Sequence, residues 1–172
     1  MVDRTLAEDI GTVASLEGEF RLRSGKISSR YFDKYRFESD PSLLRRIAAQ
    51  MVTLLPPGIE ILAGLELGGV PIATAISLET GLPAAFVRKA AKTYGTRQAV
   101  EGRDVGGKRV VLIEDVITTG GAVADAVQLV SNAGAQIIGV VCAIWRGQGA
   151  PAIAGLPNLP VAAVLTAADL AG

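Results

Sequence analysis

The sequence contains no histidine and one cysteine, Cys142. Without histidine, the chain cannot form a histidine metal site, a Ser-His-Asp triad, a Cys-His pair or a histidine general base. A single cysteine also excludes an intrachain disulfide and a cysteine metal cluster. These absences favour a reducing, cytoplasmic setting.

Net charge is absent as well, because 17 Lys and Arg residues balance 17 Asp and Glu residues. No overall field draws the chain to nucleic acid or an anionic membrane, so any anion recognition must be local. The first ten residues carry acids and lack a basic region followed by an apolar core, so we expect no secretion signal. Polar residues, glycine or proline interrupt the long uncharged stretches 126–145 and 147–168, so we expect neither to span a membrane.

Aromatic residues make up only 5% of the chain although 49% is hydrophobic, so the core must consist mainly of Ala, Val, Ile and Leu. A length of 172 residues corresponds to about one domain. From residue 59 onward, short apolar runs alternate with helical patterns. We therefore predict an α/β fold with a central, mostly parallel sheet flanked by helices. The expected strands are 59–64, 84–87, 109–113, 136–145 and 161–165, and the expected helices are 71–80 and 121–132.

The first 39 residues predict a small N-terminal cap. Residues 3–16 have the pattern of a short amphipathic helix, and residues 20–37 resemble a hairpin around Ser24-Gly25. Asp40-Pro41 is a helix-start signal, followed by apolar residues at helical spacing until Pro56-Pro57-Gly58. We expect one domain over residues 1–172, with a soft boundary between the cap (1–39) and the α/β core (40–172).

The most informative segment, residues 110–124, reads VVLIEDVITTGGAVA. It predicts a buried strand with Glu114 and Asp115 at its carboxyl end, and a Thr- and Gly-rich loop opening a helix near Ala122. Ligands bind outside the carboxyl ends of strands in open α/β sheets. Backbone N–H groups of such a loop, together with threonine hydroxyls, suit a phosphate. The residues alone also allow a plain junction with N-capping threonines and a solvated pair of acids.

This segment resembles the phosphoribosyl diphosphate (PRPP) motif of type I phosphoribosyltransferases. The chain has neither a P-loop nor a dinucleotide fingerprint, so nucleotide-triphosphate and dinucleotide binding lack their usual support. The resemblance implies that Glu114 and Asp115 contact the ribose hydroxyls and that the loop holds the 5-phosphate. The PRPP-binding residues implied here are Glu114, Asp115, Val116, Ile117, Thr118, Thr119, Gly120, Gly121 and Ala122.

Four cations without an intervening acid, at positions 88, 89, 92 and 97, predict a basic loop that could neutralise a diphosphate leaving group. A solvated surface loop is the alternative. The string FVRKAAKTYGTRQAVEG resembles the catalytic loop of orotate phosphoribosyltransferases. The resemblance places Arg88, Lys89, Lys92 and Tyr94 on PRPP, with Lys92 catalytic. Tyr94 stands where many members have histidine, and it cannot titrate near neutrality.

A second basic segment contains LRSGKISSRYFD, which resembles the N-terminal signature of the same enzymes. The resemblance makes this segment a hood over the base, with Arg23 in place of the usual lysine, which keeps the charge and changes its geometry. On the residues alone, a cationic edge strand is the alternative. Arg146 aligns with an arginine that meets orotate in the family, although it could be a solvated charge at a strand end. The orotate-binding residues implied are Arg23, Phe32, Thr118 and Arg146.

A glycine-rich turn, residues 64–71, resembles the family's diphosphate loop, in which backbone amides face the leaving group. It adds Gly68 and Gly69 to the PRPP-binding residues. Several members have lysine at the position of Gly68, so we expect this loop to rely on main-chain donors.

The resemblance implies an orotate phosphoribosyltransferase, a glycosyltransferase of the pentosyltransferase class that makes orotidine 5-monophosphate in pyrimidine (UMP) biosynthesis. Glu114 and Asp115 would stabilise oxocarbenium character, while Mg²⁺, Lys89 and Lys92 take the leaving charge. Mg²⁺ would be bound mainly through PRPP and water, with no certain protein ligand. We expect a homodimer that shares the loop Arg88–Gly95 between subunits, and neither a nucleic-acid nor a membrane partner.

Two alternatives stay open. A purine phosphoribosyltransferase would keep the PRPP site, but the basic loop and the hood argue against it. A non-catalytic, PRPP-sensing regulator would need a nucleic-acid or protein partner. No additional DNA-binding domain fits in 172 residues, and the chain has no net charge for nucleic acid.

Overall fold

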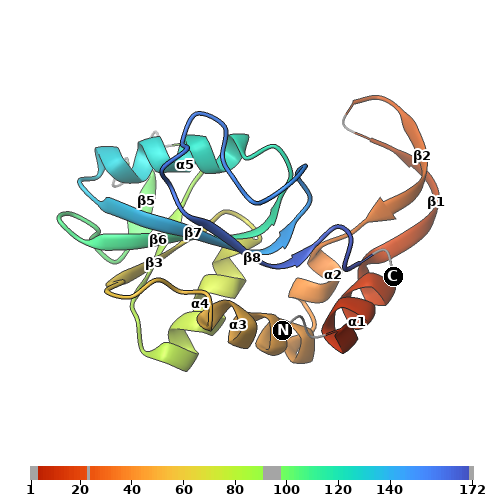
Figure 1. The fold of residues 1–172 in the computed structure, drawn as a ribbon, viewed down its shortest axis with the longest axis horizontal. Helices are drawn as coiled ribbons and strands as arrows, with labels where there is room; N and C mark the ends of the chain where they lie inside the picture. Colours follow the sequence, from red (N-terminus) through yellow and green to blue (C-terminus); the bar gives the residue numbers. More distant parts are fainter. Residues whose placement is uncertain (1–3, 23, 91–97, 171–172) are drawn as a thin grey trace.

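The computed structural model describes residues 4–22, 24–90 and 98–170, and Figure 1 shows their arrangement. The elements, in chain order, are α1 (Arg4–Ala14), β1 (Ser15–Arg21), β2 (Ile27–Phe32), α2 (Tyr35–Glu38), α3 (Pro41–Val52), β3 (Ile61–Leu65), α4 (Gly69–Thr80), β4 (Ala84–Val87), β5 (Val100–Gly102), β6 (Arg109–Ile117), α5 (Gly121–Asn132), β7 (Gln136–Trp145) and β8 (Val161–Thr166).

The central sheet has six strands in the order β5-β4-β3-β6-β7-β8. All neighbouring pairs are parallel except β4 and β5, which are antiparallel. The prediction of a mostly parallel sheet with flanking helices is confirmed, whereas the three-residue strand β5 was not predicted because it is too short to show a pattern. The chain proceeds outward in opposite directions from β3 and β6. These two strands therefore form the switch point, beside which ligands bind in open α/β sheets.

Helices cover both faces of the sheet: α1, α3 and α4 lie on one side and α5 on the other (Figure 1). Successive strand residues point to opposite faces, so β6 contributes Val111 and Ile113 to the first core, and Val110 and Leu112 to the second. Burial on both faces explains why these strands read as continuous apolar runs rather than alternating ones.

The N-terminal cap differs from its prediction in two places. β1 begins at Ser15 instead of residue 20, and residues 35–38 form the short helix α2 instead of a strand. The Asp33 carboxylate accepts the Tyr35 N–H at 3.2 Å and Phe37 is fully buried, so both residues stabilise a helical turn here. The predicted turn is present at Gly25, whose φ is 83°. The two-stranded hairpin projects away from the central sheet (Figure 1).

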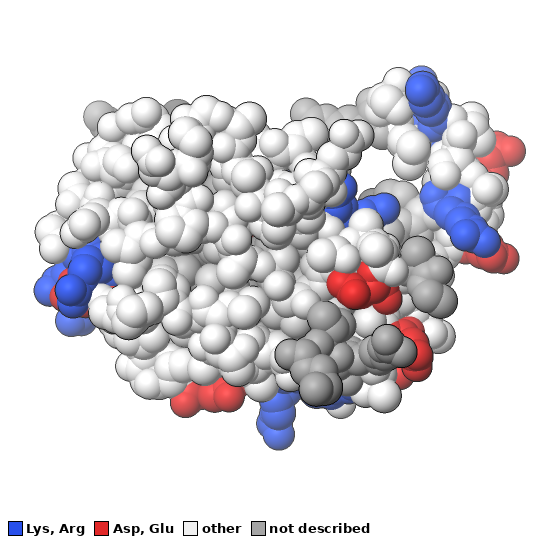
Figure 2. Space-filling view, viewed as in Figure 1, with Lys and Arg blue, Asp and Glu red and all other residues white. Residues whose placement is uncertain are grey.

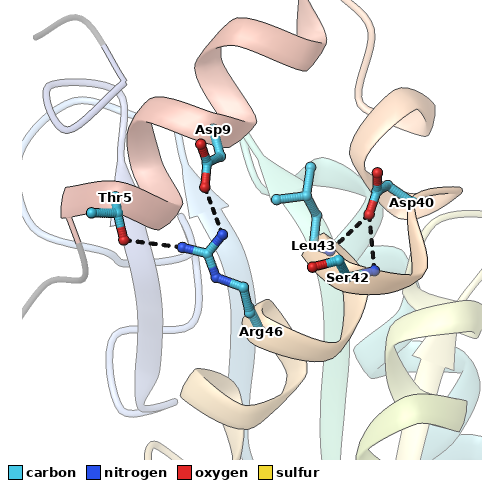
Figure 3. A network of polar contacts seen from close by, with 6 residues as sticks. All are labelled: Thr5, Asp9, Asp40, Ser42, Leu43 and Arg46. Carbon is cyan, nitrogen blue, oxygen red and sulfur yellow. Dashed lines mark hydrogen bonds and ion pairs between the residues drawn. The ribbon is translucent and has the colours of Figure 1, made fainter.

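Helix α1 of the cap is joined to helix α3 of the core by polar contacts. Asp40 Oδ1 caps α3 by accepting the N–H groups of Ser42 and Leu43 at 2.9 and 3.0 Å, as its sequence predicts (Figure 3). On the same helix, Arg46 donates to Asp9 at 2.6 Å and to Thr5 at 3.1 Å, and thereby ties α3 to α1.

Leu6, Ile10 and Phe37 belong to the same hydrophobic core as Ile47 and Ile72. The soft boundary near residue 40 is therefore not a break in packing. Within the described ranges, no helix combines the length and hydropathy that a membrane crossing requires.

Candidate active site

The two acids of the PRPP motif lie inside strand β6, not at its end. β6 continues to Ile117, because Glu114, Val116 and Ile117 pair with the apolar residues Cys142, Ile144 and Trp145 of β7. Glu114 is 8% exposed and Asp115 is fully buried. The expectation that the strand ends at residue 113 is therefore wrong, and so is the alternative of a solvated acid pair.

Glu114 lines a cavity of about 520 Å³ at the switch point. Its Oε1 accepts the Asp115 N–H at 3.0 Å. Burial, together with a hydrogen bond to the neighbouring Asp115 carboxyl and its charge, raises the pKa of Glu114 to about 9. The cavity gathers residues from three segments that are distant in sequence. Its lining includes Leu65 and Glu66, Arg88 and Lys89, and Glu114 with Thr119, Gly121 and Ala122.

The loop after β6 leaves the start of α5 open. The N-cap is Gly120, with φ 78°. No side chain of the described residues caps the helix, so neither threonine fills the capping role. Thr118 and Thr119 are exposed, and the first N–H groups of a helix attract anions. Unlike these exposed threonines, Ile117 is buried, and its side chain packs in the core beneath α5.

The turn after β3 requires glycine because α4 starts against β6. A Cβ on Gly69 would lie 2.3 Å from the carbonyl oxygen of Ile113, and one on Gly68 would lie 1.8 Å from Asp115 Oδ2. Both glycines are buried. The absence of a side chain at residue 68 thus gives Asp115 its place beside the turn.

Lys34 and Glu38 complete the surroundings of Asp115, and our sequence analysis missed both. The Lys34 ammonium lies 2.6 Å from Asp115 Oδ2, while Oδ1 accepts the Val116 N–H at 2.6 Å. Glu38 Oε1 is buried near Asp115 Oδ2, since both approach the position of a Cβ on Gly68. Their i, i+4 spacing could have indicated that Lys34 and Glu38 share one face. Nothing in the sequence linked that face to Asp115.

The proton distribution in this cluster follows from burial and charge. Burial, a hydrogen bond to Asp115 and its negative charge raise the pKa of Glu38 to about 8. Burial works against the ionised Asp115, but hydrogen bonds from Glu38, Glu114 and Lys34 outweigh it and lower the pKa of Asp115. At neutral pH, these directions leave the negative charge on Asp115 and favour the protonated form of Glu38.

The basic segment is tied to the turn after β3, because the Glu66 carboxylate accepts the Lys89 N–H. Arg88 is half-buried, and its Nε has no hydrogen-bond partner among the described residues. Lys92 and Tyr94 lie outside the described residues, as does Arg23 of the hood.

A second cavity, of about 440 Å³, lies where the hairpin meets the carboxyl end of β7, and it contains Phe32 and Arg146. Figure 2 shows a hollow between the hairpin and the rest of the molecule. The Arg146 guanidinium lies 5.2 Å from the centre of the Phe32 ring, a cation–π contact. The Arg146 N–H donates to the Ile117 carbonyl at 2.8 Å, which joins this cavity to the loop carrying Thr118.

Comparisons with known proteins agree with this geometry. Residues 39–156 match the family model "Phosphoribosyl transferase domain". An orotate phosphoribosyltransferase of Nocardioides sp. is 56% identical, over 98% of this chain and 94% of the relative. One from Methanosarcina acetivorans is 42% identical, over 89% and 82%. A crystal structure of Mycobacterium tuberculosis orotate phosphoribosyltransferase in complex with PRPP has a TM-score of 0.83 and 30% identity, over 98% of each chain. The chain therefore belongs to the orotate phosphoribosyltransferases of the type I phosphoribosyltransferase family.

Proposed function

We propose that the chain transfers the ribose 5-phosphate of PRPP to orotate, giving orotidine 5-monophosphate and diphosphate in UMP biosynthesis. One observation carries the proposal: the basic segment, Glu114 of the acid pair and the Thr/Gly loop converge on one cavity at the switch point. Such convergence of anion-binding groups suits a substrate with a phosphate at one end and a diphosphate at the other.

The reaction would depend on electrostatics rather than on a protein base, because orotate is already an anionic nucleophile. Asp115 is the ionised acid of the cluster, so its charge would stabilise oxocarbenium character at the ribose C1. Glu114, whose raised pKa favours its protonated form, would hydrogen-bond a ribose hydroxyl. Arg88, Lys89, Lys92 and Tyr94 would bind the diphosphate, and the first turn of α5 the 5-phosphate.

A magnesium ion would supply charge neutralisation of the leaving diphosphate when bound. Within the described part of the chain, no acidic or cysteine side chains form a ready-made metal cluster. A hard cation can be held mainly through substrate oxygens and water, so direct coordination by Glu114 or Asp115 would not be required.

Orotate would lie in the cavity at the hairpin, where Arg146 presents a planar fork of donors to a carboxylate. Phe32 offers an apolar face beside it, and Thr118 and Arg23 would complete the contacts.

The active unit would be a cytoplasmic homodimer in which residues 88–95 reach the partner's site. A cationic loop needs an anionic partner, and a C₂ dimer with an isologous interface is the commonest assembly. The single, buried cysteine is compatible with a reducing compartment.

The experiment is to incubate the purified chain with PRPP, Mg²⁺ and one acceptor at a time: orotate, uracil, adenine or hypoxanthine. We expect an absorbance change with orotate alone. Turnover of a purine would support the purine alternative, and PRPP binding without turnover of any acceptor would support the regulator.

A further inference from the structure

We propose that Lys34 is a substrate-binding residue of this transferase, held beside the Gly68 turn by Asp115 and Glu38 so that its ammonium contacts an oxygen of PRPP. The inference rests on the proposed function and adds a residue that our sequence analysis did not assign to the site.

The first argument is access. Asp115 is fully buried, and its two oxygens are engaged by Val116 N–H and Lys34 Nζ. The Lys34 side chain is 33% exposed. A ligand that arrives from solvent therefore meets the ammonium before it can meet the carboxylate.

The second argument is charge and donor number. Burial lowers the pKa of Lys34, but the hydrogen bond and charge of Asp115 raise it more, so the amine stays protonated. An ammonium has three donors, and the ion pair with Asp115 uses one of them. The Lys34 Nζ also lies 5.4 Å from the Tyr35 ring centre. Free donors on a fixed cation suit the oxygens of a phosphorylated sugar.

The third argument is location. Lys34 pairs with the carboxylate oxygen that lies against Gly68, at the start of the twelve-residue helix α4. Its N-cap is Gly68, and no side chain in the described ranges caps this helix. The ammonium and the open helix start therefore present positive potential on the same spot, and the turn does not rely on main-chain donors alone.

The fourth argument is energetic. Glu38 is 7% exposed, and its Oε1 has no hydrogen-bond partner among the residues that the structure describes. Burying a third carboxyl beside an ion pair is unfavourable for stability, and such arrangements concentrate at functional sites. Glu38 Oε1 and Asp115 Oδ2 both lie against Gly68, so Glu38 packs beside the carboxylate that pairs with Lys34.

The test compares Lys34→Met with Lys108→Met in the full-length chain. Lys108 is a matched control because it forms an ion pair with Glu60, at 3.3 Å, at the amino ends of the strands. We expect Lys34→Met to raise both the KM and the Kd for PRPP about ten- to a hundredfold, the effect of losing one hydrogen bond to a charged group. The KM for orotate should change less than about twofold, and Lys108→Met should behave as wild type.

An unchanged or lower KM for PRPP in folded Lys34→Met would overturn the proposal, because Lys34 would then only shield Asp115. If that variant does not fold, Lys34→Gln is tested in its place. Glutamine keeps a donor for Asp115 and removes the charge. Wild-type affinity of Lys34→Gln for PRPP would overturn the proposal. Failure of the function itself is seen separately, as absence of orotate turnover by the wild-type chain.

Discussion

At the scale of single residues, the two adjacent acids of one motif differ in protonation because their surroundings differ. Asp115 has a cation and a backbone donor, which favour its charge, whereas Glu114 has mainly desolvation and a negative neighbour, which favour its proton. Two adjacent carboxyls of similar intrinsic acidity can thus have different roles.

We predict that Asp115→Asn lowers kcat by on the order of 10²–10³, the usual loss for one preorganised electrostatic contact. Glu114→Gln should lose less, because glutamine keeps a neutral hydrogen-bonding group. Steady-state assays with orotate measure both effects, and circular dichroism checks the fold. Glu79→Gln, at an exposed position of α4, is the control. A folded double variant with near-normal kcat would contradict the assignment.

Arg146→Ala should raise the KM for orotate much more than the KM for PRPP. The guanidinium lies over Phe32 in the hairpin cavity, which shares no described lining residue with the cavity at the Thr/Gly loop. Initial rates with each substrate varied in turn separate the two constants. Equal effects on both would place Arg146 elsewhere in the mechanism.

Glu38 makes stability depend on pH. Its pKa is about 8 in the folded protein and near 4.5 when exposed, so the native state binds more protons between these values. Stability from this group is present below the unfolded pKa and is lost as pH rises through about 8. Glu38→Gln should therefore raise the Tm relative to wild type at pH 9 more than at pH 5. Thermal melts at the two pH values give the comparison, and an equal difference at both would refute it.

At the scale of elements, the sequence predicted the bounds of helices and strands best where residues that start or end these elements are present. Asp40-Pro41 marked the start of α3, and the bounds of β4, α5 and β7 agree with the prediction to the residue. β1 was misplaced because Glu17 and Glu19 interrupt its pattern, and the extension of β6 depends on pairing with β7, which local sequence does not show. The site residues were likewise predictable only where the signal is local in sequence. Local motifs predicted Glu114, Asp115 and the glycines, but the contact of Lys34 and Glu38 with Asp115 joins distant segments.

Asp40→Ala should reduce the free energy of unfolding by about 1 kcal/mol, because two N–H groups of α3 lose their acceptor. Asp40→Asn retains an acceptor and should lose less. Urea unfolding followed by circular dichroism measures both. The KM values should stay unchanged, and a large rise in either would mean that α3 helps to shape the site.

At the scale of the whole molecule, every predicted site segment with described residues leaves the sheet at its carboxyl edge or belongs to the hood beside it. The proposed homodimer would bring the partner's basic loop to this edge of the sheet.

Mixing Lys92→Ala with Asp115→Asn tests this assembly. If the loop crosses over, a mixed dimer has one site with both lesions and one with neither. Activity should then return towards about a quarter of wild type after statistical exchange, as two-fold symmetry allows. No recovery, despite subunit exchange shown by differently tagged chains, would mean that each loop serves its own subunit.

Cys142 lies in β7 with no exposed surface, and burial, with the nearby charges of Glu114 and Asp115, raises its thiol pKa to about 12. Thiol-directed dyes react with accessible thiolates, so we expect Cys142 of the native chain to remain unlabelled. A cysteine placed at Lys26, exposed beside the hairpin turn, would take up one fluorophore per chain. Its emission would follow the hairpin as orotate enters and product leaves.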